Sequence, residues 1–138
     1  MTDADPQAGY APVNGLEMYY EIHGAGRPLV VLHGAYMTID TMGEVVPGLA
    51  EARRIVAVEL QGHGRTADID RPLTYEQMAD DVAALIGHLG IEEADLFGYS
   101  MGAVSPFRSP SGTRRRCASW WPPRPPTPAT ASTPRCSR

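Results

Sequence analysis

The chain has 138 residues, which is enough for one domain with a substantial core. Residues 1–100 contain all 16 acidic residues and five arginines, whereas residues 101–138 contain seven arginines and no acidic residue, histidine or lysine. The first segment therefore has the composition of an ordinary acidic domain, and the second does not. The sequence shows no signal-peptide pattern and no apolar run long enough to cross a bilayer, so we expect a cytoplasmic protein with no membrane partner.

The first part of the chain predicts a polar lead followed by two strands. Residues 1–12 are expected to be flexible, although residues 10–13 are also candidates for a hairpin partner of the next segment. Residues 15–24, GLEMYYEIHG, alternate between apolar and polar side chains, which favours a half-buried strand. Residues 28–34, PLVVLHG, form a continuous apolar run that ends at glycine, which is typical of a strand buried on both faces.

A weak helix and a second buried strand are expected next. Residues 38–51 favour a short helix that is broken near Pro47. Residues 53–60, RRIVAVEL, again form an apolar run of strand length, and residues 61–72 form a glycine-rich loop.

The clearest helix is predicted for residues 74–89. Thr74 and Gln77 have the spacing of a capping box, and Gly90 ends the pattern. One apolar stripe runs along this helix and consists of Tyr75, Met78, Ala79, Val82, Leu85, Ile86 and Leu89. Residues 94–100 predict a third buried strand. This alternation predicts an α/β fold with a mostly parallel sheet and helices on both faces.

The third strand runs into the sequence Gly98-Tyr99-Ser100-Met101-Gly102. The pattern G-x-S-x-G is typical of a nucleophile elbow, in which a strained turn between strand and helix presents a serine. Side chains two residues before and after the serine would collide with the turn, so both positions need to be very small. An isolated match is weak, because a glycine-rich turn with an incidental serine gives the same pattern. The preceding buried strands make the elbow the stronger interpretation.

Residues 15–104 resemble the α/β-hydrolase superfamily. The matching blocks are PLVVLHGAY, RRIVAVELQGHGRT, LTYEQMADDVAALIGHLGI and ADLFGYSMG, in the order and spacing of that family. The resemblance implies a partial α/β-hydrolase fold and a serine hydrolase in which Ser100 attacks an acyl carbon. It also implies that the backbone N–H groups of Ala35 and Met101 form the oxyanion hole. Gly98, Gly102, His33 and Gly34 are then expected to shape the elbow and the neighbouring loop.

The sequence departs from the family pattern in three ways. The family often continues with a second glycine where this chain has Ala103 and Val104 after Gly102. Glu59 stands where family members commonly have aspartate, a position that is usually structural. In this fold the acid and the histidine of the triad follow the serine along the chain, and residues 101–138 contain neither. Because the nucleophile is serine and not aspartate, haloalkane dehalogenase and epoxide hydrolase activities are disfavoured. His33 and His63 are interpreted as structural or loop-packing residues rather than bases.

Three hypotheses account for residues 105–138, which are rich in arginine and proline and have no periodicity. We favour a frameshift, because the fixed codon of Trp120 and Trp121 yields Leu-Val-Ala in the shifted frame when Ser119 is encoded by AGC. A disordered basic tail and an arm that binds an anionic partner are the alternatives. The frameshift hypothesis predicts that the shifted frame continues with an acid and a histidine.

Together these observations predict three segments: a flexible lead at 1–12, the hydrolase part at 13–104, and a disordered tail at 105–138. The predicted function is esterase-like hydrolysis of a small-molecule acyl substrate, with little turnover because the acid and histidine are missing. The alternative is a non-catalytic interaction protein with a basic tail. No metal, organic cofactor or nucleic-acid partner is implied, because this chemistry needs only side chains and water, and the oligomeric state is left open.

Overall fold

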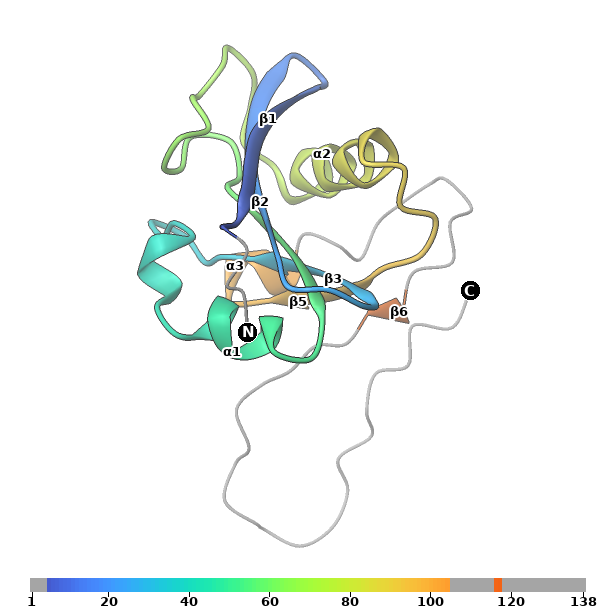
Figure 1. Cartoon of the computed structure of the whole chain (residues 1–138). Coiled ribbons are helices and arrows are strands. Elements are labelled where there is room, and N and C mark those ends of the chain that lie inside the picture. Colours follow the sequence, from blue (N-terminus) through green and yellow to red (C-terminus); the bar gives the residue numbers. More distant parts are fainter. Residues whose placement is uncertain (1–4, 105–115, 118–138) are drawn as a thin grey trace, which may run out of the picture.

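The computed structural model describes residues 5–104 and 116–117 (Figure 1). Within these residues the elements, in chain order, are β1 (Gln7–Val13), β2 (Leu16–His23), β3 (Pro28–Leu32), a 3-10 turn η1 (Asp40–Met42), α1 (Val45–Ala50), β4 (Arg54–Val58), α2 (Tyr75–His88), β5 (Asp95–Gly98), α3 (Met101–Val104) and β6 (Arg116–Cys117). The mixed sheet and its flanking helices confirm the predicted α/β class.

The described strands form one sheet in the order β1-β2-β4-β3-β5-β6. Strands β3, β4 and β5 are parallel, and β2 joins β4 in antiparallel orientation. The chain therefore moves from β3 to β4 on one side and then crosses back to β5 on the other side of β3. In open α/β sheets such a reversal marks the place, at the carboxyl ends of the strands, where sites form.

The amino-terminal hairpin begins earlier than predicted. Strand β1 starts at Gln7, so the expectation of a flexible lead through residue 12 is wrong for its second half, whereas the alternative hairpin partner at residues 10–13 is correct. Asn14 and Gly15 both have positive φ, 50° and 87°, and connect the two strands in a two-residue turn. Asn-Gly is the preferred pair for such a turn, because its two central residues must be left-handed.

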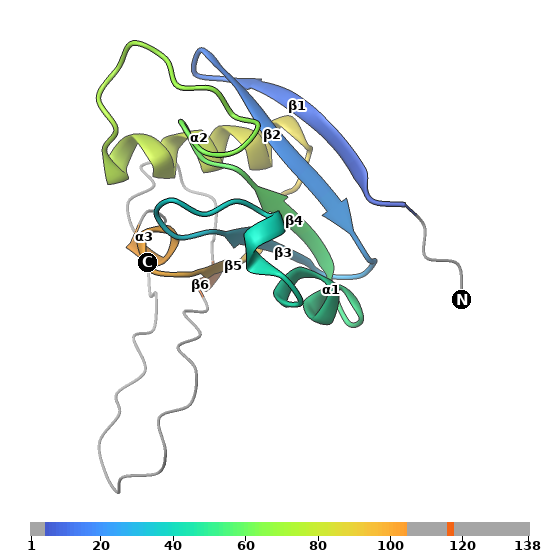
Figure 2. The same ribbon diagram turned by 90° about the vertical axis from the view of Figure 1, so that its left-hand side faces the viewer.

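Both faces of the central strands are buried, as the continuous apolar runs predict. In β3, Val30 and Leu32 contribute to one core with the apolar stripe of α2, while Leu29 and Val31 contribute to a second core that includes Val46 of α1. Figures 1 and 2 show the two helices on opposite sides of the sheet. Alternate residues of one strand therefore anchor both helix layers.

The helical predictions need two corrections. The expected helix at residues 38–51 is two pieces, and the interruption lies at Gly43, whose φ is 56°, and not at Pro47. Pro47 instead lies in the first turn of α1, where a missing N–H has no consequence. In α2, Thr74 caps the helix by accepting from the backbone N–H of Gln77 at 3.1 Å, as predicted, but Tyr75 is half exposed and lies outside the apolar stripe.

A tail with no strand after residue 104 would leave β5 at an open sheet edge, but the structure places a further strand beside it. Asp95 and Leu96 of β5 pair with Arg116 and Cys117 of β6 in parallel orientation. This pairing covers half of β5 with a piece of the segment expected to be irregular. The remainder of residues 105–138, including the region of the proposed frameshift, lies outside the described residues. Within the described part, no helix is both long and apolar enough to span a membrane.

Candidate active site

Ser100 lies in a strained and exposed turn between β5 and α3. Strand β5 ends at Gly98, α3 starts at Met101, and the φ angle of Ser100 is 51°. A left-handed conformation is costly for a residue with a Cβ and persists only where the surroundings enforce it. Two backbone bonds do so here: Tyr99 N–H donates to the Leu32 carbonyl at 3.0 Å, and Gly102 N–H donates to the Tyr99 carbonyl at 2.9 Å.

Gly102 allows the turn to pack directly against the end of β3. A Cβ at this position would lie 2.6 Å from the carbonyl oxygens of both Leu32 and His33. These are backbone atoms, which cannot rotate away as the end of a side chain can. The close approach brings the first turn of α3, with Met101 at its amino-terminal end, beside the loop that follows β3.

His33 determines how the next peptide group is oriented. Its ring is fully buried; Nδ1 donates to the Gly34 carbonyl at 2.7 Å, and Nε2 accepts from the Leu60 N–H at 3.0 Å. Met37 N–H also donates to the Gly34 carbonyl, at 3.2 Å. In a trans peptide the N–H points away from the carbonyl. The Ala35 N–H therefore points away from His33, and within the described residues it donates to no protein atom.

The pKa of His33 is lowered, first by burial, which disfavours the charged ring, and further by the neighbouring His63. The ring centroids of the two histidines are 4.8 Å apart. A neutral ring with Nδ1 protonated is the form that satisfies both hydrogen bonds of His33, because Nε2 must accept. His33 is thus fully engaged in holding the ends of β3 and β4 together.

Residues 34–37 form a tight turn with a left-handed residue at its third position. Met37 N–H closes it on the Gly34 carbonyl, and Tyr36 at its third position has a φ of 60°, whereas Ala35 is not left-handed. Glycine is the usual residue at this third position, so Tyr36 adopts it under strain. Its side chain is 99% exposed and makes no compensating contact with the core.

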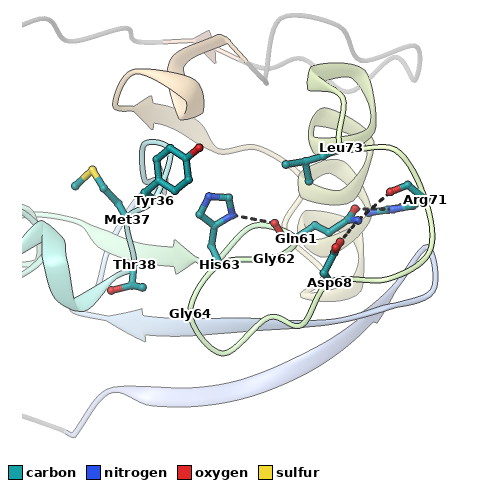
Figure 3. A pocket seen from close by; sticks show the side chains of 10 residues that line it. All are labelled: Tyr36, Met37, Thr38, Gln61, Gly62, His63, Gly64, Asp68, Arg71 and Leu73. Atoms are coloured by element: carbon teal, nitrogen blue, oxygen red, sulfur yellow. Dashed lines mark hydrogen bonds between the residues drawn. The ribbon is translucent and has the colours of Figure 1, made fainter.

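A pocket opens beside this turn at the carboxyl ends of β3 and β4 (Figure 3). Its lining comes from the two following loops and consists of Tyr36, Met37, Thr38, Gln61, Gly62, His63, Gly64, Asp68, Arg71 and Leu73. Ser100 is not part of this lining. Gly34 lies between the neighbour of Ser100 and the pocket: a Cβ on Gly34 would lie 2.9 Å from the Tyr99 ring and 3.2 Å from the sulfur of Met37, which lines the pocket.

A buried carboxylate joins the loops on either side of the pocket. Glu59, fully buried at the end of β4, accepts from the backbone N–H of Ile39 at 3.2 Å and of Arg65 at 2.6 Å, and from the Arg65 guanidinium at 2.8 Å. Burial by itself raises the pKa of Glu59, but the hydrogen bonds from Arg65 outweigh it and the pKa is lowered. Sequence reasoning identified this position as structural but could not find its partners, which are set by loop conformation.

The structure thus brings together most of the residues that the sequence singled out. Gly102 contacts the Leu32 and His33 carbonyls, His33 binds Gly34, and Ser100 lies exposed between Tyr99 and Met101. It does not bring a base to the serine: in residues 5–104, no histidine or carboxylate forms a hydrogen bond with Ser100.

Comparison with known proteins agrees with this arrangement. The sequence matches the Alpha/beta hydrolase family over residues 29–135, and the chain belongs to this family. That range extends beyond Val104 into the segment that we predicted to be a tail. The similarity places the protein among enzymes of one fold that carry out different reactions.

The related proteins are named for different activities. A soluble epoxide hydrolase from Corynebacterium sp. (strain C12) is 36% identical over 100 residues, which cover 70% of this chain and 34% of the relative. A putative esterase/lipase from Haemophilus influenzae is 32% identical over 80 residues, covering 58% of this chain and 28% of the relative. The chain therefore spans about a third of the length of these relatives.

Two solved structures resemble the chain closely. Epoxide hydrolase CorEH superposes with a TM-score of 0.70 at 32% identity and covers 75% of this chain and 36% of its own. The enol-lactonase from Burkholderia xenovorans LB400 superposes with a TM-score of 0.67 at 29% identity, covering 71% of this chain and 39% of its own. The shared part carries the fold, while the substrates of these proteins differ.

Proposed function

We propose that the chain carries the nucleophile and oxyanion-binding half of a serine-hydrolase site that cleaves an ester or related acyl bond. The observation that supports this most directly is the conformation of Ser100, exposed at a φ of 51° between β5 and α3. The Ala35 N–H, turned away from His33, and the Met101 N–H at the start of α3 are the proposed donors to the oxyanion.

In this reaction the Ser100 Oγ bonds to the acyl carbon while its proton passes to a general base. The carbonyl electron pair moves onto oxygen, where the two backbone N–H groups stabilise the negative charge, and each such donor contributes roughly 3 kcal/mol. Return of that pair breaks the bond to the leaving alcohol, which takes the proton from the base. Water then attacks the acyl-serine by the same sequence of steps.

The serine favours acyl substrates over epoxides. A carboxylate that opens an epoxide gives an ester, which water can hydrolyse, whereas a serine that opens an epoxide gives an ether, which is stable to hydrolysis. The similarity to epoxide hydrolases is therefore evidence for the fold, whereas the serine at position 100 favours an acyl substrate. Esters, lactones and other activated acyl compounds all fit this half of the site, with esters as the broadest class.

We further propose that this chain turns over slowly by itself. In the family, the histidine that accepts the serine proton follows the serine, and residues 101–138 contain no histidine or acidic residue. Without a base the hydroxyl stays protonated and is a weak nucleophile. The Ser100 hydroxyl, held in the conformation of an elbow but without a base, should react only with strongly activated reagents.

The test is labelling with a fluorophosphonate, in which an Oγ–P bond forms and fluoride leaves. We expect slow labelling confined to Ser100, and we expect added imidazole to accelerate it by acting as an external base. The variant S100G removes Oγ and relieves the positive φ, so it should be at least as stable as the parent and remain unlabelled. Labelling that persists in S100G would show that Ser100 is not the nucleophile. No labelling even with imidazole, together with salt-sensitive binding to a polyanion, would support the interaction protein instead.

A further inference from the structure

The pocket between the β3 and β4 loops offers hydrogen-bond acceptors to a ligand. His63 Nδ1 lies 2.8 Å from the Gln61 carbonyl, which can only accept, so in the neutral ring Nδ1 carries the proton and Nε2 keeps a lone pair. Figure 3 shows the His63 ring projecting from its loop toward Tyr36, with the bond to Gln61 on one edge. Asp68 is the second acceptor: its bonds within the described residues, to Gln61 and Ile69, both use Oδ1.

The positive charge in the lining is already neutralised. Arg71 donates from Nε to the Gln61 side chain at 2.7 Å and from Nη1 to the Asn14 carbonyl at 3.4 Å, and its Nη2 is paired with the buried carboxylate of Asp81. Each nitrogen of the guanidinium thus has a protein partner. The pocket presents one exposed carboxylate and no uncommitted cation among its ten lining residues, so an anionic ligand is disfavoured.

The mouth of the pocket carries exposed apolar surface that the fold does not require. Tyr36 is 99% exposed and strained, and Leu73, across the pocket, is half exposed. Replacing Tyr36 by glycine would relieve the φ of 60° without removing any core contact. A tyrosine is therefore unfavourable for stability at this position, and strain of this kind is concentrated at functional sites. We therefore expect the Tyr36 side chain to contact a bound ligand.

We propose that this pocket binds an uncharged molecule with an apolar body and one O–H or N–H donor. The donor binds His63 Nε2 or Asp68 Oδ2, and the apolar body lies between Tyr36 and Leu73. Binding of this molecule does not require Ser100. The proposed function enters only when the molecule is identified as the acyl or the alcohol portion of a substrate. The substrate class then narrows to neutral esters that carry a donor group on one side.

Three small probes of similar size separate these requirements. Phenol is neutral and has a donor, anisole lacks the donor, and benzoate is an anion near neutral pH. Titrations followed by protein NMR should show phenol shifting the resonances of the two pocket loops. Anisole should bind roughly tenfold more weakly, the effect of one hydrogen bond, and benzoate more weakly than phenol. Equal binding of all three, or shifts located elsewhere, would overturn the proposal.

Variants distinguish a loss of binding from a loss of folding. Tyr36→Gly should be more stable than the parent and yet bind phenol about three- to tenfold more weakly, a combination that a general structural defect cannot produce. His63→Phe, which keeps a ring beside His33, and Asp68→Ala each remove one of the two acceptors, so one of these variants should abolish the preference for phenol over anisole. Tyr10→Ala removes another exposed tyrosine, on β1 away from the pocket lining, and should leave phenol affinity unchanged.

A further variant separates this inference from the proposed function. S100G should bind phenol as the parent does, because Ser100 does not line the pocket. Phenol binding without fluorophosphonate labelling would therefore support the proposed ligand pocket and reject the proposal that Ser100 is the nucleophile. Undiminished phenol binding in Tyr36→Gly, or a preference for phenol over anisole that is unchanged in both His63→Phe and Asp68→Ala, would reject the pocket proposal, whatever the labelling shows.

Discussion

Gly102→Ala tests whether the elbow is held by direct backbone packing. The added methyl group would meet the Leu32 and His33 carbonyl oxygens at 2.6 Å and the Leu32 carbonyl carbon at 2.8 Å, all closer than real Cβ contacts. Gly102 does not have a positive φ, so the whole effect is steric. Overpacking in a well-packed site costs about 1–3 kcal/mol, and contacts with backbone atoms favour the upper end, about 3 kcal/mol.

The matched control is Gly87→Ala. Gly87 lies in α2, is exposed, and has no atom within 4 Å of a built Cβ, so alanine should stabilise the helix by about 0.5–1 kcal/mol. Urea unfolding followed by circular dichroism gives both free energies of unfolding. A Gly102→Ala variant within about 0.5 kcal/mol of the parent, with its m-value unchanged, would refute the packing argument, because the elbow would then tolerate a side chain that the structure excludes.

Three further predictions concern stability. Burial first, and then His63, lower the pKa of His33, so its stabilising neutral form is fully populated above the ordinary value of 6.5. The free energy of unfolding should therefore fall as the pH drops below 6.5 toward the folded-state pKa. His33→Asn should be less stable than the parent, but its free energy of unfolding, measured by urea unfolding at a series of pH values, should change less with pH. Glu59→Gln should cost about 2–3 kcal/mol by the same assay, because it removes the charge that pairs with Arg65; an unchanged midpoint would contradict the role of this carboxylate. Thr74→Ala should cost about 1 kcal/mol through loss of the helix cap, and a Thr74→Ser control should lose much less.

The parts of the fold that sequence predicted best are those determined by local patterns. Continuous apolar runs located the central strands, because a strand buried on both faces needs apolar residues at every position. Thr74 located the start of α2 because its cap is a local hydrogen bond. The glycine spacing around Ser100 located the turn, because a side chain at Gly102, two residues after the serine, would meet the backbone at the end of β3.

The parts that sequence missed depend on long-range contacts or on strain. The partners of Glu59 come from the loops after β3 and β4, and no local pattern joins them. The left-handed Tyr36 had no signal at all, because tyrosine rarely adopts this conformation. The early start of β1 does have a local signal, because Asn14-Gly15 is a preferred hairpin pair and the strand that follows it is long enough to pair back to Gln7.

The two strained residues near the site, Tyr36 and Ser100, are held by the same end of β3. The Leu32 carbonyl accepts from Tyr99 beside Ser100, and the Gly34 carbonyl accepts from Met37 beside Tyr36. Because the described contacts that enforce the elbow come from residues 32–102, its geometry does not depend on a catalytic histidine. Under the proposed function, the position of Ser100 and the transfer of its proton are thus separable, and an external base should make Ser100 reactive without any change in the turn.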